Sequence, residues 1–246
     1  LQTKTSFWDR EKLIRNTRGY YALISLLDHE FGRILATLER LGLRDNTIIV
    51  YTSDHGDMLG SQNLTHKQLP FREAANVPLL VSWKGKTWTG VNEECLGLAD
   101  LPVSLMSLLG LQFGSKRDGE NLGALFTDPK ARGKEAVPIF DLVPAHQAED
   151  RGGFEWAGLK TKTHTFAKKS DGSPWLLFDD ARDPFQLKNL AADASHSQTL
   201  QKFSSDTDKA LKQHDFAFGP WKDTIRNLGL VDVWNKSQAY FKRASI

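Results

Sequence analysis

The stretch TIIVYTSDHGDMLG, residues 47–60, joins an apolar, β-branched run to three ionisable side chains within four positions. The run TIIVYT predicts a central strand of a sheet, buried on both faces. Asp54, His55 and Asp57 follow at its carboxyl end, with Gly56 between them. Charged groups in that position are costly unless something binds them. This stretch therefore indicates both a fold and a candidate site.

A long helix is predicted before this strand. Between residues 9 and 42 apolar residues recur at three- and four-residue steps, and Gly42 stands where such a helix would end. Helix, turn and strand in this order are typical of a doubly wound α/β domain, in which ligands bind at the carboxyl ends of the strands. Asp54 and His55 fall at that end. The sequence further predicts a short helix at 67–76, a second strand at 77–83 and a helix at 98–111.

The pattern changes after about residue 135. The runs VPIFDLV, EWAGLKTKT, HTFAKK and PWLLFDD are short, strand-like and separated by turn residues, which predicts an antiparallel sheet. Residues 197–214 then show helical periodicity. We therefore predict an α/β domain over residues 1–134, and a small C-terminal α+β subdomain of antiparallel sheet and helix over residues 135–246.

Composition excludes several classes of protein. The 246 residues carry a formal net charge of +2, a near-balance that indicates neither nucleic acid nor an anionic membrane as partner. No run approaches the roughly 20 apolar residues of a membrane span. Cys95 is the one cysteine, which excludes an internal disulfide and a cysteine-rich zinc site. We expect Cys95 to be a small buried apolar residue.

Asp54 and His55 suggest a metal site, although an incomplete one. Neighbouring side chains on an extended strand point to opposite faces, so only a turn just past the strand lets both meet one ion, and Gly56 makes such a turn easier. Ca²⁺ needs six or more oxygen ligands, and Zn²⁺ or Mn²⁺ usually needs further protein ligands. The alternative is a turn aspartate that caps backbone N–H groups, beside a surface histidine.

The surrounding sequence resembles the type I sulfatase family. TSDHGDMLGSQNLTHKQLPFREAANVPLLVSW is similar to the family segment T-S-D-H/N-G, glycine, lysine, Y-E-E and R-V-P-L-I-V. Upstream, YYALISLLDHEFGRILATLERLGLRDNTIIV resembles the family's preceding helix and turn. Further on, GLKTKTHTFA and PWLLFDDARDPFQLKNLA resemble the C-terminal patterns R-T-x-x-Y-K-Y and L-Y-D-L-x-x-D-P-x-E-x-x-N-L. The resemblance covers residues 8–195 or so.

This resemblance implies an alkaline phosphatase-like α/β fold and a role for each matched residue. Asp54 and His55 match ligands of the active-site metal, usually Ca²⁺; a histidine in place of asparagine leaves Mn²⁺ or Zn²⁺ open. Lys67 matches the catalytic lysine that contacts the sulfate and stabilises the leaving oxygen, and the alternative is a solvated surface lysine. His66 would face the substrate pocket, or is an ordinary loop histidine.

Other family residues do not occur in the printed sequence. The nucleophile motif C/S-x-P-S/T-R, which carries formylglycine, is missing, and so is the early Asp-Asp pair that completes the metal site. We therefore expect the chain to be the C-terminal portion of a sulfatase and to be inactive alone. A sheet without its first strands would have an exposed edge, so we expect dimerisation, rearrangement or limited solubility.

Two other functions stay open, as do the substrate and the location. The chain could belong to a phosphonate monoester or phosphodiester hydrolase of the same superfamily, or be a non-catalytic binding module. The resemblance implies a sulfated small molecule or carbohydrate as substrate, and a periplasmic or secreted protein. Candidate contacts to an anionic sugar are Lys160, Lys162, His164 and His146, each of which is otherwise a solvated side chain.

Overall fold

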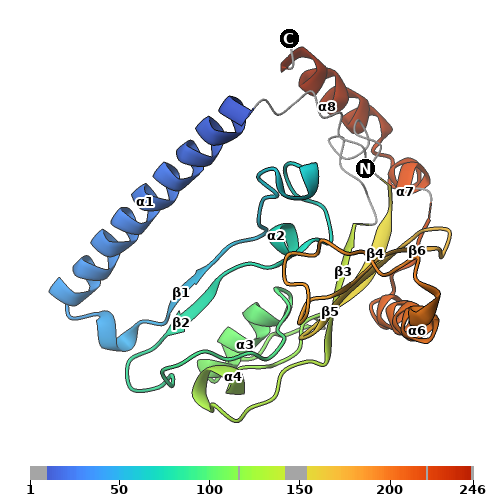
Figure 1. The fold of residues 1–246 in the computed structure, drawn as a ribbon. Helices are drawn as coiled ribbons and strands as arrows, with labels where there is room; N and C mark the ends of the chain where they lie inside the picture. The colour runs from blue at the N-terminus through green and yellow to red at the C-terminus, as the bar shows by residue number, and fades with distance from the viewer. Residues whose placement is uncertain (1–9, 116, 142–153, 220, 245–246) are drawn as a thin grey trace. The chain divides into compact units, whose positions relative to one another are not determined.

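The computed structural model describes residues 10–115, 117–141, 154–219 and 221–244 (Figure 1). The chain forms two compact units. Of the described residues, one unit comprises those within 10–67 and 71–137, and the other comprises those within 68–70 and 138–244. Helices accompany a two-stranded and a four-stranded sheet, so the predicted mixed α/β class is confirmed. We call the two parts the N-terminal and the C-terminal unit.

The N-terminal unit begins with the predicted long helix, α1 (Arg10–Arg40). Gly42 ends it with a left-handed φ of 65°, and Leu43 N–H donates back to the Leu38 carbonyl, an arrangement that satisfies the last carbonyls of a helix. No residue of α1 is buried. Its apolar stripe is only partly covered: Phe31 packs edge-on against Tyr51 of the following strand at 5.4 Å, whereas large side chains such as Leu23 and Leu27 are more than half exposed.

After the turn η2 (Arg44–Asn46), β1 (Ile49–Thr52) pairs antiparallel with β2 (Leu79–Ser82), from Ile49 opposite Ser82 to Thr52 opposite Leu79. Both strands were predicted. The expected burial of β1 on both faces is wrong for the described chain, because Ile49 to Tyr51 are half-buried and Thr52 is exposed. A two-stranded sheet covered by few side chains cannot bury both faces.

Among the described residues, the N-terminal unit also contains the short turn η3 (Ser61–Asn63) and the helices α2 (Arg72–Ala75), α3 (Asp100–Leu108) and α4 (Ala124–Thr127). The carboxylate of Asp100, 1% exposed, accepts hydrogen bonds from Gly97 N–H, Glu120 N–H and the Lys134 ammonium. Burial acts to lower the pKa of Lys134, but the bonds and charges of Asp100 and Glu120 outweigh it and raise that pKa. Cys95 is half-buried rather than buried, since it lies in an extended bridge to Lys134.

The C-terminal unit is built on the predicted antiparallel sheet, in the strand order β3–β4–β5–β6. The strands are β3 (Ala136–Asp141), β4 (Trp156–Thr161), β5 (His164–Lys169) and β6 (Pro174–Asp179). The predicted helix α6 (Ser197–Gln213) follows the turn η4 (Ala194–His196) and packs on the sheet, where Phe203 stacks on Phe166 at 5.7 Å between ring centroids. Helices α7 (Trp221–Asn227) and α8 (Val231–Ala244) end the described chain.

The core of the C-terminal unit lies between this sheet and α6. Phe166, Ala167 and Leu177 are fully buried, and Phe203 and Leu211 contribute from the helix. The buried Lys168 ammonium donates to Asp208 of α6 at 2.6 Å. Gly158 of β4 permits the close approach of β5, because a Cβ there would lie 1.8 Å from the Phe166 carbonyl oxygen.

Candidate functional site

The turn after β1 brings Asp54 and His55 together, as predicted. The Oδ1 atom of Asp54 accepts hydrogen bonds from His55 N–H at 3.0 Å and from the Ser53 hydroxyl at 3.3 Å. Its Oδ2 atom lies 3.5 Å from His55 Nε2, and both side chains are open to solvent, 84% and 42% exposed. The carboxylate is therefore fixed through one oxygen, and the other oxygen faces the imidazole.

Hydrogen bonding also fixes the tautomer of the His55 ring. Its Nδ1 lies 2.8 Å from the Gly56 carbonyl oxygen, which can only accept, so Nδ1 carries the proton. The lone pair of the neutral ring is then on Nε2, the atom that faces Asp54 Oδ2. A backbone carbonyl on the far nitrogen is the usual support for a metal-binding histidine.

The pKa of Asp54 is lowered, first by the hydrogen bond from His55 N–H; desolvation opposes this, and the charge of His55 adds to the lowering. The carboxylate consequently stays ionised over the working range of most hydrolases. The alternative, in which Asp54 is a turn aspartate that caps backbone N–H groups, also applies in part, because Asp54 does accept from the His55 N–H. Capping uses Oδ1 and leaves Oδ2 available.

These two residues fit part of a cation site. A carboxylate oxygen and an imidazole nitrogen 3.5 Å apart can each reach one ion at about 2.0–2.6 Å. The nearby Asp57 turns away, since its Oδ1 accepts from Leu59 N–H at 2.8 Å. Within the described ranges no group of three His, Cys, Asp or Glu side chains is placed to hold a metal ion. Asp54 and His55 would have to share the ion with other ligands.

Gly56 is required for a reason that the sequence did not reveal. Its φ is not positive, but a Cβ at this position would lie 1.8 Å from the Glu73 carbonyl oxygen. Gly56 N–H donates to the Ala74 carbonyl at 2.9 Å. The glycine therefore lets the turn that carries Asp54 and His55 lie directly against α2, and the hydrogen bond to Ala74 of α2 holds this turn in place.

Lys67 and His66 lie in the loop between this turn and α2. Met58 and Leu64 are buried beneath the loop, and Met58 N–H donates to the His66 carbonyl at 2.8 Å. His66 and Lys67 are half-buried. Among the described residues no hydrogen bond or ion pair joins Lys67 to Asp54 or His55, so the structure places the predicted site residues in one unit without direct contact between the lysine and the pair.

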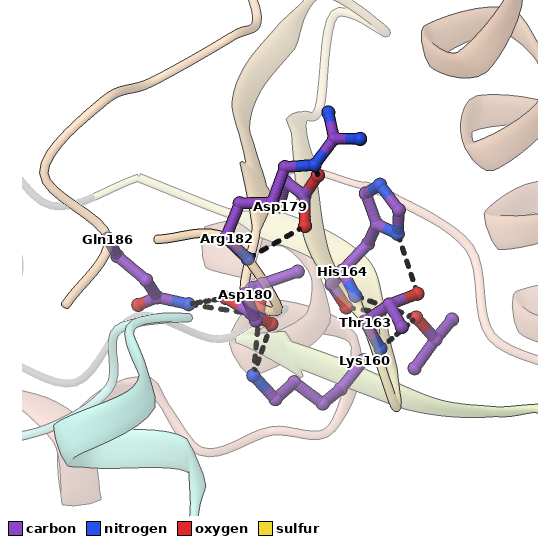
Figure 2. Close-up of polar contacts among 9 residues, drawn as sticks. Lys160, Thr163, His164, Asp179, Asp180, Arg182 and Gln186 are labelled. Atoms are coloured by element: carbon purple, nitrogen blue, oxygen red, sulfur yellow. Dashed lines mark hydrogen bonds and ion pairs between the residues drawn. The ribbon is translucent and has the colours of Figure 1, made fainter. Parts of the chain in front are cut away.

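Two of the candidate sugar contacts of the C-terminal unit, Lys160 and His164, make other contacts (Figure 2). Lys160 pairs with Asp180 at 2.7 Å and donates to Thr165 Oγ1, also at 2.7 Å. His164 Nδ1 lies 2.9 Å from the Thr163 hydroxyl, and its ring packs on Phe203. Lys162 is exposed, and His146 lies outside the described residues. The idea that Lys160 is a solvated side chain is wrong, because its charge is committed to a largely buried network.

That network was missed in the sequence. Asp180 and the fully buried Gln186 are joined at 2.7 Å, and the Gln186 amide also donates to Thr165 Oγ1 at 3.0 Å. One signal was available: the family pattern L-Y-D-L-x-x-D-P-x-E has leucine and glutamate where this chain has Asp180 and Gln186.

Comparison with known proteins gives a consistent result. The family model described as Sulfatase matches residues 2–111. An endo-4-O-sulfatase of Bacteroides thetaiotaomicron is 31% identical over 224 residues, which are 85% of this chain and 43% of that protein. An ulvan-active sulfatase of Formosa agariphila is 28% identical over 229 residues, covering 85% of this chain and 44% of that protein. The chain thus spans less than half the length of the curated relatives it matches.

Solved structures share the fold. A sulfatase structure from Bacteroides fragilis superposes with a TM-score of 0.73 at 25% identity, over 89% of this chain and 46% of that one. A phosphonate monoester hydrolase of Agrobacterium radiobacter gives a TM-score of 0.70 at 24% identity, over 85% and 44%. In the part of the chain that the structure covers, no helix is long and apolar enough to cross a membrane.

Proposed function

Because the chain belongs to the type I sulfatases of the alkaline phosphatase-like superfamily, we propose that it forms part of a sulfuric ester hydrolase. In this proposal Asp54 and His55 bind the metal ion, and Lys67 binds the sulfate group of the substrate. The observation that carries the proposal is the pairing of Asp54 Oδ2 with His55 Nε2 at 3.5 Å, with the opposite ring nitrogen fixed by a carbonyl.

Each residue has a chemical task in sulfate ester hydrolysis. Asp54 supplies a negatively charged oxygen and His55 a neutral nitrogen to a cation, for which Ca²⁺ is the family's usual choice and Mn²⁺ or Zn²⁺ suits the imidazole. When bound, such a cation supplies Lewis-acid stabilisation of sulfate oxygens. Lys67 supplies a compact ammonium donor to the tetrahedral group and to the oxygen that leaves with the alcohol. His66 borders the same pocket in this proposal.

Cation binding provides the first test. We expect Ca²⁺ or Mn²⁺ to bind the purified chain weakly, with Kd on the order of millimolar, because two protein ligands make an incomplete site. Asp54→Asn should weaken binding at least tenfold, since it removes the charge and leaves the turn's acceptor oxygen in place. Asp57→Asn is the matched control, because the Asp57 carboxylate accepts from Leu59 N–H, and it should leave Kd within twofold. Titration calorimetry measures both; equal losses in the two variants would contradict the assignment.

Catalysis by these 246 residues alone is not expected. The sequence contains no C/S-x-P-S/T-R motif, and Cys95 is followed by Leu-Gly-Leu. Without a nucleophile there is no covalent route for sulfuryl transfer. We expect the purified chain to hydrolyse a chromogenic aryl sulfate no faster than the double variant Asp54→Ala, Lys67→Ala. Turnover well above that control would show that the nucleophile lies within the printed sequence.

The substrate class that we propose is a sulfated carbohydrate or a sulfated small molecule. Support comes from a relative whose name gives it activity on ulvan. In keeping with such substrates, we propose a periplasmic or secreted protein. We also propose that the unpaired edges of the two-stranded sheet permit self-association.

A phosphonate monoester hydrolase is the second candidate function. It is favoured by one observation at the site, the hydrogen bond of His55 Nδ1 to the Gly56 carbonyl, which leaves Nε2 as the ring nitrogen for a cation; an imidazole nitrogen suits Mn²⁺ or Zn²⁺ better than Ca²⁺. The shared fold with one such hydrolase, at 24% identity, is compatible with this function. Binding of Mn²⁺ at least tenfold tighter than Ca²⁺ in the titration above would favour it, and the reverse preference would favour the sulfatase.

A further inference from the structure

The hydroxyl group of Ser53 contacts both residues that we propose as ligands of the cation. Ser53 directly follows the last residue of β1 and is half-buried. Its hydroxyl donates to the His55 carbonyl oxygen at 2.7 Å and reaches Asp54 Oδ1 at 3.3 Å. A hydroxyl has one hydrogen to donate, and only the shorter contact has the usual length of an O–H···O hydrogen bond. The bond to the His55 carbonyl is therefore the stronger of the two.

This bond holds one end of the peptide unit that joins His55 to Gly56. The carbonyl of the unit accepts from the Ser53 hydroxyl, and its N–H donates to the Ala74 carbonyl at 2.9 Å. A peptide unit is planar, so a hydrogen bond at each end fixes its orientation. The first bond comes from the end of β1 and the second from α2. Two different elements of the N-terminal unit thus hold this peptide.

The orientation of this peptide decides where the His55 ring lies. The peptide joins the Cα atom that carries the imidazole to the Cα atom of Gly56, whose carbonyl oxygen lies 2.8 Å from Nδ1. The imidazole and its carbonyl partner therefore stand at the two ends of one rigid unit, and a rotation of the unit would move them apart. With the unit fixed, the opposite ring nitrogen, Nε2, lies 3.5 Å from Asp54 Oδ2.

From this geometry we infer that Ser53 is a positioning residue for the proposed cation site. Its hydroxyl fixes the peptide between His55 and Gly56, and this peptide directs Nε2 of the imidazole toward Asp54 Oδ2. The inference rests on the proposed function only for the role of Asp54 and His55 as a ligand pair. Ser53 acts through His55 and is not itself a ligand.

Three variants separate this role from a general effect on the turn. Ser53→Ala removes the hydroxyl, and Ser53→Thr keeps it. Thr52→Val is the matched control, because it removes the hydroxyl of an exposed neighbour that reaches the Ser53 carbonyl only at 3.5 Å. The His55 ring is observed by long-range ¹H–¹⁵N correlation in mildly alkaline buffer, where imidazole is neutral. Its signals are those that His55→Gln removes. Binding of Mn²⁺ is measured from the electron paramagnetic resonance signal of the free ion.

We expect the His55 ring of the unaltered chain to carry its proton on Nδ1. Ser53→Ala should release the ring to a mixture of both tautomers and weaken Mn²⁺ binding about tenfold, the lower end of the usual effect of removing a group that orients a ligand. Ser53→Thr and Thr52→Val should keep the tautomer and leave Kd within about twofold.

A Ser53 that only stabilised the fold would lower the unfolding midpoint of Ser53→Ala and leave the ring and the Kd of the folded protein unchanged. That result would overturn the inference. Equal effects of Ser53→Ala and Thr52→Val would overturn it as well, and so would a loss in Ser53→Thr as large as that in Ser53→Ala, because the threonine retains the hydroxyl.

A measurement on the unaltered chain covers the case in which Ser53→Ala does not fold. The Ser53 hydroxyl proton should exchange with solvent about tenfold more slowly than that of the exposed Ser170, because its hydrogen bond must open first, and equal rates would overturn the inference. The exchange is read from the ¹³Cβ resonances in mixed H₂O and D₂O. Failure of the proposed function is recognised separately. If the unaltered chain binds no Mn²⁺, Asp54 and His55 are not a cation site, while the hydroxyl exchange and the tautomers, both measured without metal, still decide whether Ser53 positions the ring.

Discussion

Replacing Asp180 by alanine should destabilise the C-terminal unit by about 3–5 kcal/mol, the usual cost of removing one partner from a buried ion pair. The Asp180 side chain is 7% exposed and its partner Lys160 is 15% exposed. Three donors converge on this one carboxylate, namely the Lys160 ammonium, the Thr165 hydroxyl and the Gln186 amide, each at 2.7 Å (Figure 2). The variant removes the acceptor of the Thr165 hydroxyl, leaves Lys160 and Gln186 with only Thr165 Oγ1 as an acceptor in this network, and leaves the positive charge of Lys160 buried without its counter-ion.

Asp179 provides the matched control, one residue earlier in the chain. Its ion pair with Arg182 is longer, at 3.6 Å, and the Arg182 side chain is 89% exposed. Exposed pairs of this kind contribute about 0–1 kcal/mol, so Asp179→Ala should be nearly neutral. Denaturant unfolding followed by tryptophan fluorescence measures both variants. Equal destabilisation would contradict the network; so would a stable Asp180→Ala protein, because other groups would then have to satisfy Lys160.

The same network explains an unusual backbone position. Gln186 is 1% exposed and has a φ of 54°, whereas its neighbours Phe185 and Leu187 are 72% and 77% exposed. The side-chain amide is drawn inward by Asp180 and Thr165, and the two apolar side chains point to solvent. A polar residue inside and apolar residues outside reverse the ordinary preference, so hydrogen bonding to Asp180 decides how this loop folds.

Local pattern was enough to predict most elements, because helices and hairpin strands follow from periodicity and turn residues. The helix predicted over residues 9–42 is α1, and the four strand-like runs after residue 135 are β3 to β6. Burial did not follow from pattern. The β1 run looks like a fully buried strand but is half-buried, because burial depends on which layers lie against a strand and not on its own composition.

In the candidate site, too, the sequence predicted some features and the others required the structure. Its position after β1 followed from the general placement of ligands at strand ends, and the structure does bring Asp54 and His55 together. The tautomer of His55 and the close approach of Gly56 to Glu73 depend on atoms that sequence spacing does not specify. The commitment of Lys160 to Asp180 was also unpredictable by spacing, since the strands β5 and β6 lie between the two partners in the chain. Roles of single lysines therefore needed the structure.

The second large effect concerns two leucines that have equally apolar patterns in the sequence. Leu177 of β6 is fully buried, and Leu177→Ala should lower the free energy of unfolding of the C-terminal unit by about 2–5 kcal/mol, the cost of a large-to-small change in a packed core. Leu27 of α1 is 51% exposed, although it lies on the apolar stripe that predicted the helix. Leu27→Ala should change stability by less than about 0.5 kcal/mol, because alanine favours helix as strongly as leucine and little contact is lost.

Fluorescence of the tryptophans in the C-terminal unit reports on Leu177→Ala, and helical circular dichroism reports on Leu27→Ala. The two results need not agree, since the two leucines lie in different compact units. A cost above about 2 kcal/mol for Leu27→Ala would show that the apolar stripe of α1 is covered in solution. Repeating the measurement at several protein concentrations then identifies the cover. A cost that grows with concentration means that the stripe is buried between copies of this chain, whereas a constant cost means that it packs within one chain.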